Sequence, residues 1–322
     1  MLTVLVQRDG RVERADDVDP AWLLPESTAV VWADIEGPVD TDRALLSGVF
    51  RVHELAVEDA LSEIHHPKIE TYDGLLYLIL HGITSTSEAG GFVDTQDVDF
   101  FLGRNFLVTV HHAPSRSIAA EHESCLRRPD IFADGPVGIC HRIVDRMVDH
   151  YAPVVASIEE RIEALEEAVF DRPWESPLKE LLRAKRDIAA LRRVVLPQRD
   201  AIGRLARREF APVTEALGYR FRDVYDQLVR LSEEAILLQD RATGLVDAFL
   251  SNQSNRLNQV MKVLTVISTI FMPLTVLTGM WGMNVTLPML PGGDAWQFWW
   301  LALFIVGICA TMLWMFRRMR WL

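Results

Sequence analysis

The N-terminal part of the chain alternates short apolar runs with turn-forming residues. Two segments, 42–50 and 54–63, repeat apolar residues at helical spacing and predict helices. Runs that are rich in β-branched and aromatic residues predict the strands around them. We therefore expect a mixed α/β domain over residues 1–140. The predicted strands are residues 2–7, 29–34, 75–83, 98–103 and 106–112.

From about residue 137 onward the pattern becomes almost entirely helical. The spacing predicts one helix over 143–170 and a second over 178–206, which form a helical hairpin within residues 141–215. Acidic side chains gather on the first arm and basic side chains on the second. We therefore expect two solvated arms that pair through their charges. These residues are Glu159, Glu160, Glu163, Glu166 and Glu167 on the first arm, and Lys185, Arg186, Arg192 and Arg193 on the second.

A further helical pattern is much longer than the others. Its apolar positions alternate steps of three and four over four heptads, which is the spacing of a coiled-coil seam. No proline interrupts the chain between Val213 and Pro273, so the pattern predicts one stalk helix that continues into an apolar segment, within residues 216–281. At 1.5 Å per residue it would span roughly 90 Å. The seam consists of Phe221, Val224, Leu228, Leu231, Ala235, Leu238, Ala242, Leu245 and Phe249.

Two apolar segments near the C-terminus predict membrane-spanning helices. Residues 263–281 and 298–316 are each nineteen residues without a charge, close to the ~20 that cross a ~30 Å hydrocarbon core. The loop between them, 282–297, contains no basic residue, whereas basic residues flank both segments on their other sides. The positive-inside rule then places the loop outside and both termini in the cytoplasm, with the chain in the plasma (inner) membrane. Residues 298–322 would form the second crossing and a basic cytoplasmic tail.

Small, polar and soft side chains share one face of the first apolar segment. At 100° per residue they fall within an arc of about 120°, and branched aliphatic residues occupy the opposite side. Two interpretations stay open: a face that packs against another helix, or the lining of a pore. Two crossings per chain cannot enclose a pore, so the second interpretation requires a ring of identical subunits. This polar face consists of Asn258, Met261, Leu264, Thr265, Ser268, Met272, Thr275 and Gly279.

Acidic and basic residues are distributed unevenly along the chain, and this distribution argues against some classes of binding partner. Residues 256–322 carry five basic residues and one acidic residue, Asp294, which leaves 28 basic and 44 acidic residues in 1–255. The excess of acidic residues in 1–255 argues against a nucleic-acid-binding protein, which would show a basic face. The three cysteines have no paired spacing and predict neither a disulfide framework nor a zinc knuckle. We find no phosphate-binding loop or nucleophile motif, so an enzyme is not expected.

Two pairs of adjacent histidines are candidate metal ligands. Neighbouring residues point to opposite faces of a strand and about 100° apart on a helix. No carboxylate or cysteine recurs beside either pair at the spacing of metal ligands. We therefore expect His65, His66, His111 and His112 to have structural roles.

The stretch Gly282-Met283-Asn284 follows the proline-containing first segment and precedes a short loop and a second crossing. This arrangement resembles the CorA-type magnesium transporter family, whose signature is Gly-Met-Asn at the end of the first of two C-terminal crossings. The resemblance extends over "MKVLTVISTIFMPLTVLTGMWGMN" (261–284) and over "LAVEDALSEIHHPKIETYDGLLYLIL" (55–80). The architecture is similar over essentially the whole chain.

The resemblance implies a homopentamer that conducts Mg²⁺ inward. Five first crossings would line the pore, the second crossings would surround them, and the α/β domains would form a cytosolic funnel. Gly282, Met283 and Asn284 would form the selectivity filter. Cytosolic Mg²⁺ would regulate the pore by binding between neighbouring subunits, at Asp59 with Asp223 and at a second site with Asp247. The implied pore-lining residues are Asn258, Met261, Leu264, Ser268, Met272 and Thr275.

Two departures from the family pattern bear on ion capture. The outer loop lacks the acidic residue that commonly follows the motif, which leaves Asp294 to attract cations at the outer mouth, and Trp281 replaces the commoner tyrosine. Within the same architecture Zn²⁺, Co²⁺ or Ni²⁺ are alternative cargoes, although Met283 favours Mg²⁺. Outside transport, the alternative is a membrane-anchored sensor that conducts nothing.

Overall fold

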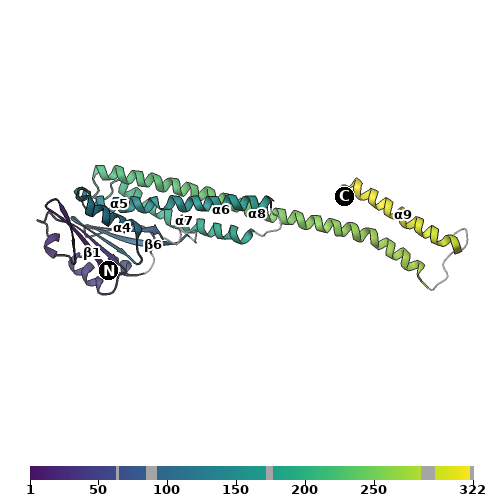
Figure 1. Ribbon diagram of the computed structural model, residues 1–322, viewed down its shortest axis with the longest axis horizontal. Helices are drawn as coiled ribbons and strands as arrows, with labels where there is room; N and C mark the ends of the chain where they lie inside the picture. The colour runs from purple at the N-terminus through teal and green to yellow at the C-terminus, as the bar shows by residue number, and fades with distance from the viewer. Residues whose placement is uncertain (63–64, 85–92, 172–176, 284–293, 320–322) are drawn as a thin grey trace. The chain divides into compact units, whose positions relative to one another are not determined.

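The computed structural model describes residues 1–62, 65–84, 93–171, 177–283 and 294–319. They divide into two units, Met1–Val246 and Asp247–Leu322. The first unit contains a mixed sheet and a set of long helices (Figure 1). The second contains two apolar helices.

Seven strands of the described part form one sheet in the order β2-β1-β3-β7-β6-β5-β4. Parallel pairing joins β3 to β7, and the remaining neighbours are antiparallel. The five predicted strands are confirmed, with small shifts at their ends. The strands are β1 (Leu2–Arg8), β2 (Arg11–Ala15), β3 (Val30–Glu36), β4 (Lys68–Tyr72), β5 (Leu75–Ile83), β6 (Thr95–Leu102) and β7 (Phe106–His111).

Two strands, β2 and β4, were not predicted. Each has five residues, carries mostly polar side chains and occupies an edge of the sheet, so neither shows the buried apolar run by which strands are recognised. The turns that join β2 and β4 to the neighbouring strands did contain a sequence pattern that predicts hairpins. Asp9-Gly10 joins β1 to β2 and Asp73-Gly74 joins β4 to β5, and all four residues have positive φ between 48° and 86°. Asp-Gly is the pair that favours such tight hairpin turns.

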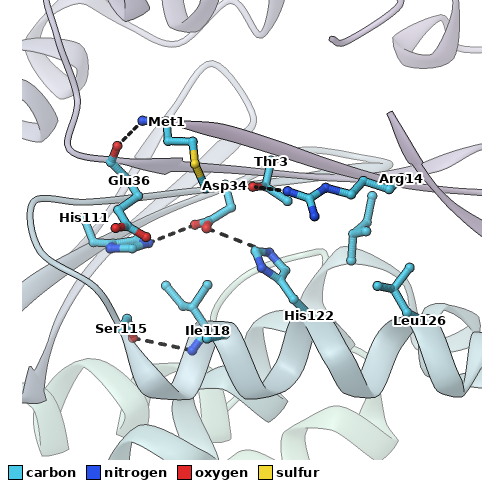
Figure 2. A pocket seen from close by; sticks show the side chains of 12 residues that line it. Met1, Thr3, Arg14, Asp34, Glu36, His111, Ser115, Ile118, His122 and Leu126 are labelled. Carbon is cyan, nitrogen blue, oxygen red and sulfur yellow. Dashed lines mark hydrogen bonds and ion pairs between the residues drawn. The ribbon is translucent and has the colours of Figure 1, made fainter. Parts of the chain in front are cut away.

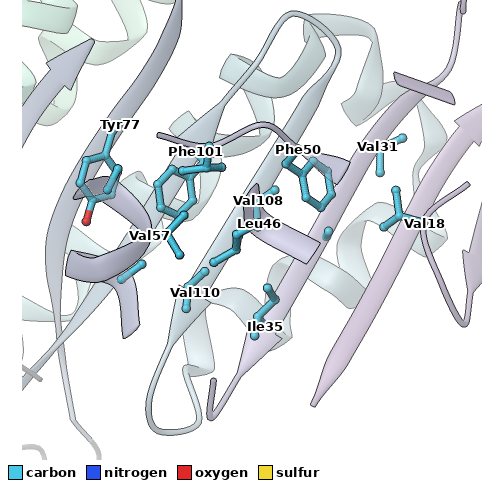
Figure 3. Close-up of a cluster of buried hydrophobic side chains, with 14 of the residues drawn as sticks. Val18, Val31, Ile35, Leu46, Phe50, Val57, Tyr77, Phe101, Val108 and Val110 are labelled. Atoms are coloured by element: carbon cyan, nitrogen blue, oxygen red, sulfur yellow. The ribbon is translucent and has the colours of Figure 1, made fainter. Parts of the chain in front are cut away.

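Helices cover both faces of the sheet. On one face α1 (Asp42–Ala44), the π-helical turn η2 (Leu45–Val49) and α2 (Glu54–Leu61) close a cluster of buried apolar residues (Figure 3). Within this cluster the rings of Tyr77 and Phe101 stack with centroids 4.7 Å apart. On the other face lie α4 (Arg116–Arg127), η3 (Pro129–Asp134) and α5 (Gly135–Asp149). There α5 packs so closely on β5 that a Cβ added at Gly82 would lie 3.4 Å from Met147 Cε.

One predicted helix is two helices in the structure. The pattern over 143–170 predicted a continuous helix, but α5 ends at Asp149 and α6 (Tyr151–Asp171) begins after His150. Pro153 explains the break, because its ring clashes with the carbonyl four residues earlier and it has no N–H to donate. Pro153 lies in the first turn of α6, where the N–H groups have no partner within the helix, so its missing N–H breaks no helical hydrogen bond there.

The charges of the hairpin do not pair as predicted. Between α6 and α7 (Leu178–Ala206), Arg161 Nη1 contacts the buried Asp187 Oδ2 at 2.8 Å, so the predicted acidic arm supplies the base. Two of its acids contact α8 instead, where Arg241 lies 3.5 Å from Glu159 and 3.4 Å from Glu166. The prediction was wrong because it treated the hairpin as two helices in water, whereas the N-terminal part of α8 packs beside them (Figure 1).

The long helix is confirmed. α8 runs from Glu215 to Trp281, 67 residues, and includes Pro273. Thr214 precedes it, and its Oγ1 accepts a hydrogen bond from the Leu217 N–H, which caps the helix start. All nine seam residues are buried, none more than 8% exposed. This burial follows from the three-and-four spacing, which keeps the seam on one side of the helix.

The second unit consists of the C-terminal part of α8 and of α9 (Asp294–Arg318). Both helices are long and apolar enough to cross a membrane. Their large side chains are exposed, for example Phe271 at 62%, Trp299 at 65% and Trp314 at 62%. A soluble protein rarely exposes so much contiguous apolar surface. The chain therefore combines an α/β domain, a long stalk helix and a second apolar helix, which is the predicted fold class.

Candidate ion pathway and regulatory carboxylates

The polar face of α8 is open in the single chain. All six residues predicted to line a pore, from Asn258 to Thr275, are exposed. On the opposite side of the helix Val266 is buried, and Ile270, Leu274 and Leu277 are half-buried. Val263 and Ile267 on that side are exposed as well, at 61% and 49%, so exposure alone does not distinguish the two faces. The polar face remains a prediction from the spacing, and in the single chain it is free to meet water or a neighbouring copy.

Threonine hydroxyls on this face already use their hydrogens. Thr265 Oγ1 donates to the Met261 carbonyl at 2.7 Å, and Thr275 Oγ1 donates to the Phe271 carbonyl at 2.9 Å. A hydroxyl has one hydrogen to donate and two lone pairs that accept. With the hydrogen bound to the helix, each hydroxyl presents lone pairs outward. The water molecules around a cation point their hydrogens outward, so these hydroxyls can accept from a hydrated cation.

The helix ends at the predicted filter. Gly282 N–H donates to the Thr278 carbonyl at 2.9 Å, and Met283 N–H donates to the Met280 carbonyl at 3.3 Å. A Cβ at position 282 would lie 3.3 Å from the Thr278 carbonyl oxygen, which is tighter than ordinary contact, so a side chain here would force the turn to shift by a few tenths of an ångström. Asn284 lies outside the described residues, as does the side chain of Asp294.

Asp59, predicted to bind regulatory Mg²⁺, lies in the last turn of α2 and has partners within its own chain. Lys68 Nζ, at the start of β4, donates to Asp59 Oδ2 at 2.6 Å and to Glu70 Oε2 at 2.9 Å. His65 Nε2 lies 3.6 Å from Asp59 Oδ1. Tyr72 donates its hydroxyl hydrogen to Glu70 at 2.8 Å. The aspartate is therefore one member of a mixed-charge cluster.

The electrostatics of this cluster favour the charged forms. Burial lowers the pKa of Lys68, but hydrogen bonds and attraction from Asp59 and Glu70 outweigh burial, so the pKa is raised. Burial raises the pKa of Glu70, and Lys68 and Tyr72 together outweigh it, so the pKa is lowered. Both shifts indicate a stable ammonium between two carboxylates.

A buried pair lies beneath the cluster. Tyr77 donates its hydroxyl hydrogen to Asp99 Oδ1 at 2.5 Å, and its ring centroid lies 5.4 Å from Lys68 Nζ. Burial raises the pKa of Asp99 to about 7, although the hydrogen bond from Tyr77 opposes the rise. The sequence interpretation missed Lys68, Glu70 and this pair. The alternation of Lys68, Glu70 and Tyr72 on one face of a strand was a usable signal, but β4 itself was not recognised.

The other two predicted regulatory carboxylates, Asp223 and Asp247, are exposed on α8. Asp223 lies close enough to α5 to influence Asp145. The pKa of Asp145 is raised mainly by burial, and the charges of Asp149 and Asp223 add to the rise. Carboxylate oxygens are hard ligands that suit Mg²⁺. Within one chain, however, the described residues include no group of three or more histidines, cysteines or carboxylates placed to hold a metal ion.

Three of the four paired histidines, His65, His111 and His112, have contacts within the chain. His111 Nε2 lies 3.2 Å from Asp34 Oδ1, and its Nδ1 contacts the Ala113 carbonyl at 2.7 Å. His122 Nε2, from α4, lies 3.8 Å from Asp34 Oδ2. The three side chains converge at a cavity of about 230 Å³ between the sheet and α4 (Figure 2). Asp34 is distant in sequence from both histidines, so no local spacing could have predicted the cluster.

The pair between His111 and Asp34 makes stability depend on pH. Burial lowers the pKa of His111, but the carboxylate of Asp34 and the Ala113 carbonyl outweigh it, so the pKa is raised. Such a group stabilises the fold below its unfolded pKa of ~6.5, and this stabilisation is lost as pH rises through the folded pKa. We expect His111→Gln to destabilise the protein by about 1–2 kcal/mol more at pH 6 than at pH 8.5.

Thermal melts of the full chain in detergent at the two pH values measure this difference. His112→Gln is the control, because the neighbouring imidazole contacts the Ser62 carbonyl instead of a carboxylate. A loss of stability in His111→Gln that is equal at both pH values would contradict the assignment.

Comparison with known proteins gives one consistent result. The family model described as CorA-like Mg²⁺ transporter protein matches residues 27–318. YfjQ of Bacillus subtilis (strain 168), a protein provisionally assigned as a metal ion transporter, is 33% identical over 302 residues, which are 94% of this chain and 89% of the relative. The cobalt/magnesium transport protein CorA of Thermotoga maritima is 29% identical over 321 residues, covering 96% of this chain and 88% of that protein. The complete structure of the CorA magnesium transporter from Methanocaldococcus jannaschii has a TM-score of 0.82 at 21% identity and covers 100% of this chain and 99% of its own.

Proposed function

Because the chain belongs to the CorA-like Mg²⁺ transporter protein family, and is therefore a divalent metal ion transporter and not an enzyme, we propose that it conducts Mg²⁺ into the cell. Co²⁺ and Ni²⁺ would be further cargoes of the same pathway. The observation that carries the proposal is the exposed polar face of α8, whose threonine hydroxyls present only lone pairs. The membrane potential would drive entry, since a divalent ion gains about 4.6 kcal/mol per 100 mV.

The pathway requires several copies of the chain. One chain contributes a single polar face, so a ring of copies is needed to enclose water, and the family resemblance gives five. Residues 1–140 and 141–215 would stay in the cytosol, where the flanking basic residues also place both termini. Residues 216–281 would form the stalk and the first crossing, residues 282–297 the outer loop, and residues 298–322 the second crossing and the tail.

The filter would select by leaving the hydration shell in place. Mg²⁺ gives up its water reluctantly. A ring of Asn284 amide oxygens and Gly282 carbonyls would accept hydrogen bonds from the hydrated ion, with Met283 between them. Neutral oxygens hold the ion weakly enough for it to leave, as conduction requires. With no other acid in the outer loop, Asp294 would be the group that attracts cations at the mouth.

The gate would be apolar and its control electrostatic. Met261, Leu264 and Met272 are exposed on the polar face and would form a constriction that closes by losing its water. Regulatory Mg²⁺ would bind Asp59 of one copy and Asp223 of the next, with Asp247 at a second site. The ions would offset repulsion between carboxylates and hold the gate closed. The proposal is supported by Asp223 and Asp247, whose carboxylates are exposed on α8.

Uptake in cells that lack their own magnesium transporters tests the function. We expect the chain to restore Mg²⁺ uptake, and unlabelled Co²⁺ to compete with it while Zn²⁺ does not. Preferred uptake of Zn²⁺ would reassign the cargo within the family. No uptake of any of the three ions, with the protein present in the membrane, would favour a sensor that conducts nothing.

A further inference from the structure

The carboxylate that is proposed to take regulatory Mg²⁺ is already occupied by a cation of its own chain. The ammonium of Lys68 lies 2.6 Å from Asp59 Oδ2 and 2.9 Å from Glu70 Oε2. The side chains of Asp59 and Lys68 are only 26% and 32% exposed. We propose that Lys68 competes with the divalent cation for Asp59 and thereby sets the cytosolic Mg²⁺ concentration at which the transporter closes, an inference that rests on the proposed regulatory role of Asp59.

The fold holds the ammonium at this position. Lys68 begins β4 and pairs with Ile79 of β5 in the sheet register. Residues two apart on a strand share a face, so Glu70 lies next to Lys68 and is itself held by the Tyr72 hydroxyl at 2.8 Å. The ring of Tyr77 lies 5.4 Å from the ammonium and supplies a cation–π contact. The lysine is therefore held by its surroundings even without Asp59.

Competition follows from this second anchor. Lys68 holds Oδ2 of Asp59, and the His65 imidazole lies 3.6 Å from Oδ1. A divalent ion at this carboxylate would therefore lie close to the ammonium, and repulsion between the two cations makes its binding compete with the contact of Lys68. When Lys68 leaves Asp59 it keeps its contact with Glu70, so displacement does not leave the ammonium without a counter-charge. When Mg²⁺ binds, the Lys68 ammonium therefore only moves from a position between Asp59 and Glu70 to a contact with Glu70 alone. Without Lys68, Mg²⁺ would bind Asp59 with no competitor and would close the pore at a lower concentration.

The test uses the full chain in proteoliposomes, with Mg²⁺ as the probe. For Lys68→Gln we expect the internal Mg²⁺ concentration that halves influx to fall roughly tenfold, the size of effect that a partly exposed ion pair allows. Lys68→Arg keeps the charge and should stay near the wild-type value. Lys179→Gln, an exposed lysine on α7, makes the same change in net charge elsewhere and should have no effect.

A second readout does not depend on conduction. Mg²⁺ that binds the folded chain raises its melting temperature in detergent by mass action. The Mg²⁺ concentration at half of this rise should fall by the same factor in Lys68→Gln. Influx at zero internal Mg²⁺ checks that the variant is folded, and Lys68→Met is measured in parallel in case the glutamine variant folds poorly.

Asp59→Asn separates the inference from the function on which it rests. Alone, Asp59→Asn should weaken inhibition by Mg²⁺, and adding Lys68→Gln to it should change nothing further. Unchanged Mg²⁺ sensitivity in both Lys68 variants, with Asp59→Asn still weakening inhibition, overturns the competition and leaves the regulatory role of Asp59 intact. Unchanged inhibition in Asp59→Asn overturns that role and the inference together.

Discussion

Asn284→Ala is expected to reduce cation uptake to background. If the amide oxygens of several copies form the first ring of acceptors for hydrated Mg²⁺, then alanine removes every side-chain acceptor of the ring at once. The remaining backbone carbonyls would not replace them, because the methyl groups leave a wider and apolar opening. A divalent ion that keeps its water shell needs acceptors for that shell when it leaves bulk water.

Uptake of Mg²⁺ in transport-deficient cells measures this effect, with the amount of protein in the membrane determined for each variant. Asn284→Gln keeps the amide on a longer side chain and should retain part of the uptake. Thr71→Ala, in the edge strand β4, is a control that leaves the membrane segments unchanged. Normal uptake by Asn284→Ala would remove the asparagine from the pathway and would favour another role for the Gly-Met-Asn stretch.

Asp223→Lys is expected to make influx insensitive to internal Mg²⁺. The variant replaces a proposed Mg²⁺ ligand by a permanent cation of the same chain. That cation would repel Mg²⁺ from the site, so changes in the Mg²⁺ concentration would no longer alter the interface between copies. Influx should therefore stay the same as internal Mg²⁺ rises through the range that closes the wild-type protein.

Proteoliposomes loaded with a series of Mg²⁺ concentrations measure this response. Glu233→Lys is a matched control, because Glu233 is also an exposed acid on α8 and undergoes the same change of charge. It should leave the inhibition unchanged. Ordinary feedback inhibition in Asp223→Lys would exclude this aspartate from regulation, whatever the ion that the protein carries.

The features that could be predicted are those with a local physical cause. The seam of α8 was predictable because burial on one side of a helix imposes a spacing of three and four residues. The buried strands were predictable because their apolar runs lie between turn formers. The edge strands β2 and β4 were missed because their side chains remain largely in water and show no such run. The break between α5 and α6 was missed although Pro153 signalled it.

The candidate site divides in the same way. The polar face of α8 was predicted from the spacing alone, and it stays a prediction, because apolar residues on other sides of the helix, such as Val263 and Phe271, are exposed as well. The partners of the charged groups were not predicted. Asp59 and Lys68 meet because β4 folds back along β5 beside the end of α2. Arg241 reaches the acids of α6 because α8 packs beside that helix.

The sequence by itself determined the family, the two apolar crossings, the long stalk helix and the position of the Gly-Met-Asn stretch. Each of these depends on short-range patterns, in which the hydrophobic effect and helix geometry act over a few consecutive residues. Only the tertiary structure decided which charges meet: Lys68 with Asp59, His111 with Asp34, and Arg241 with Glu159. An ion pair depends on the final distance between two atoms, and that distance is set by the packing of elements far apart in the chain.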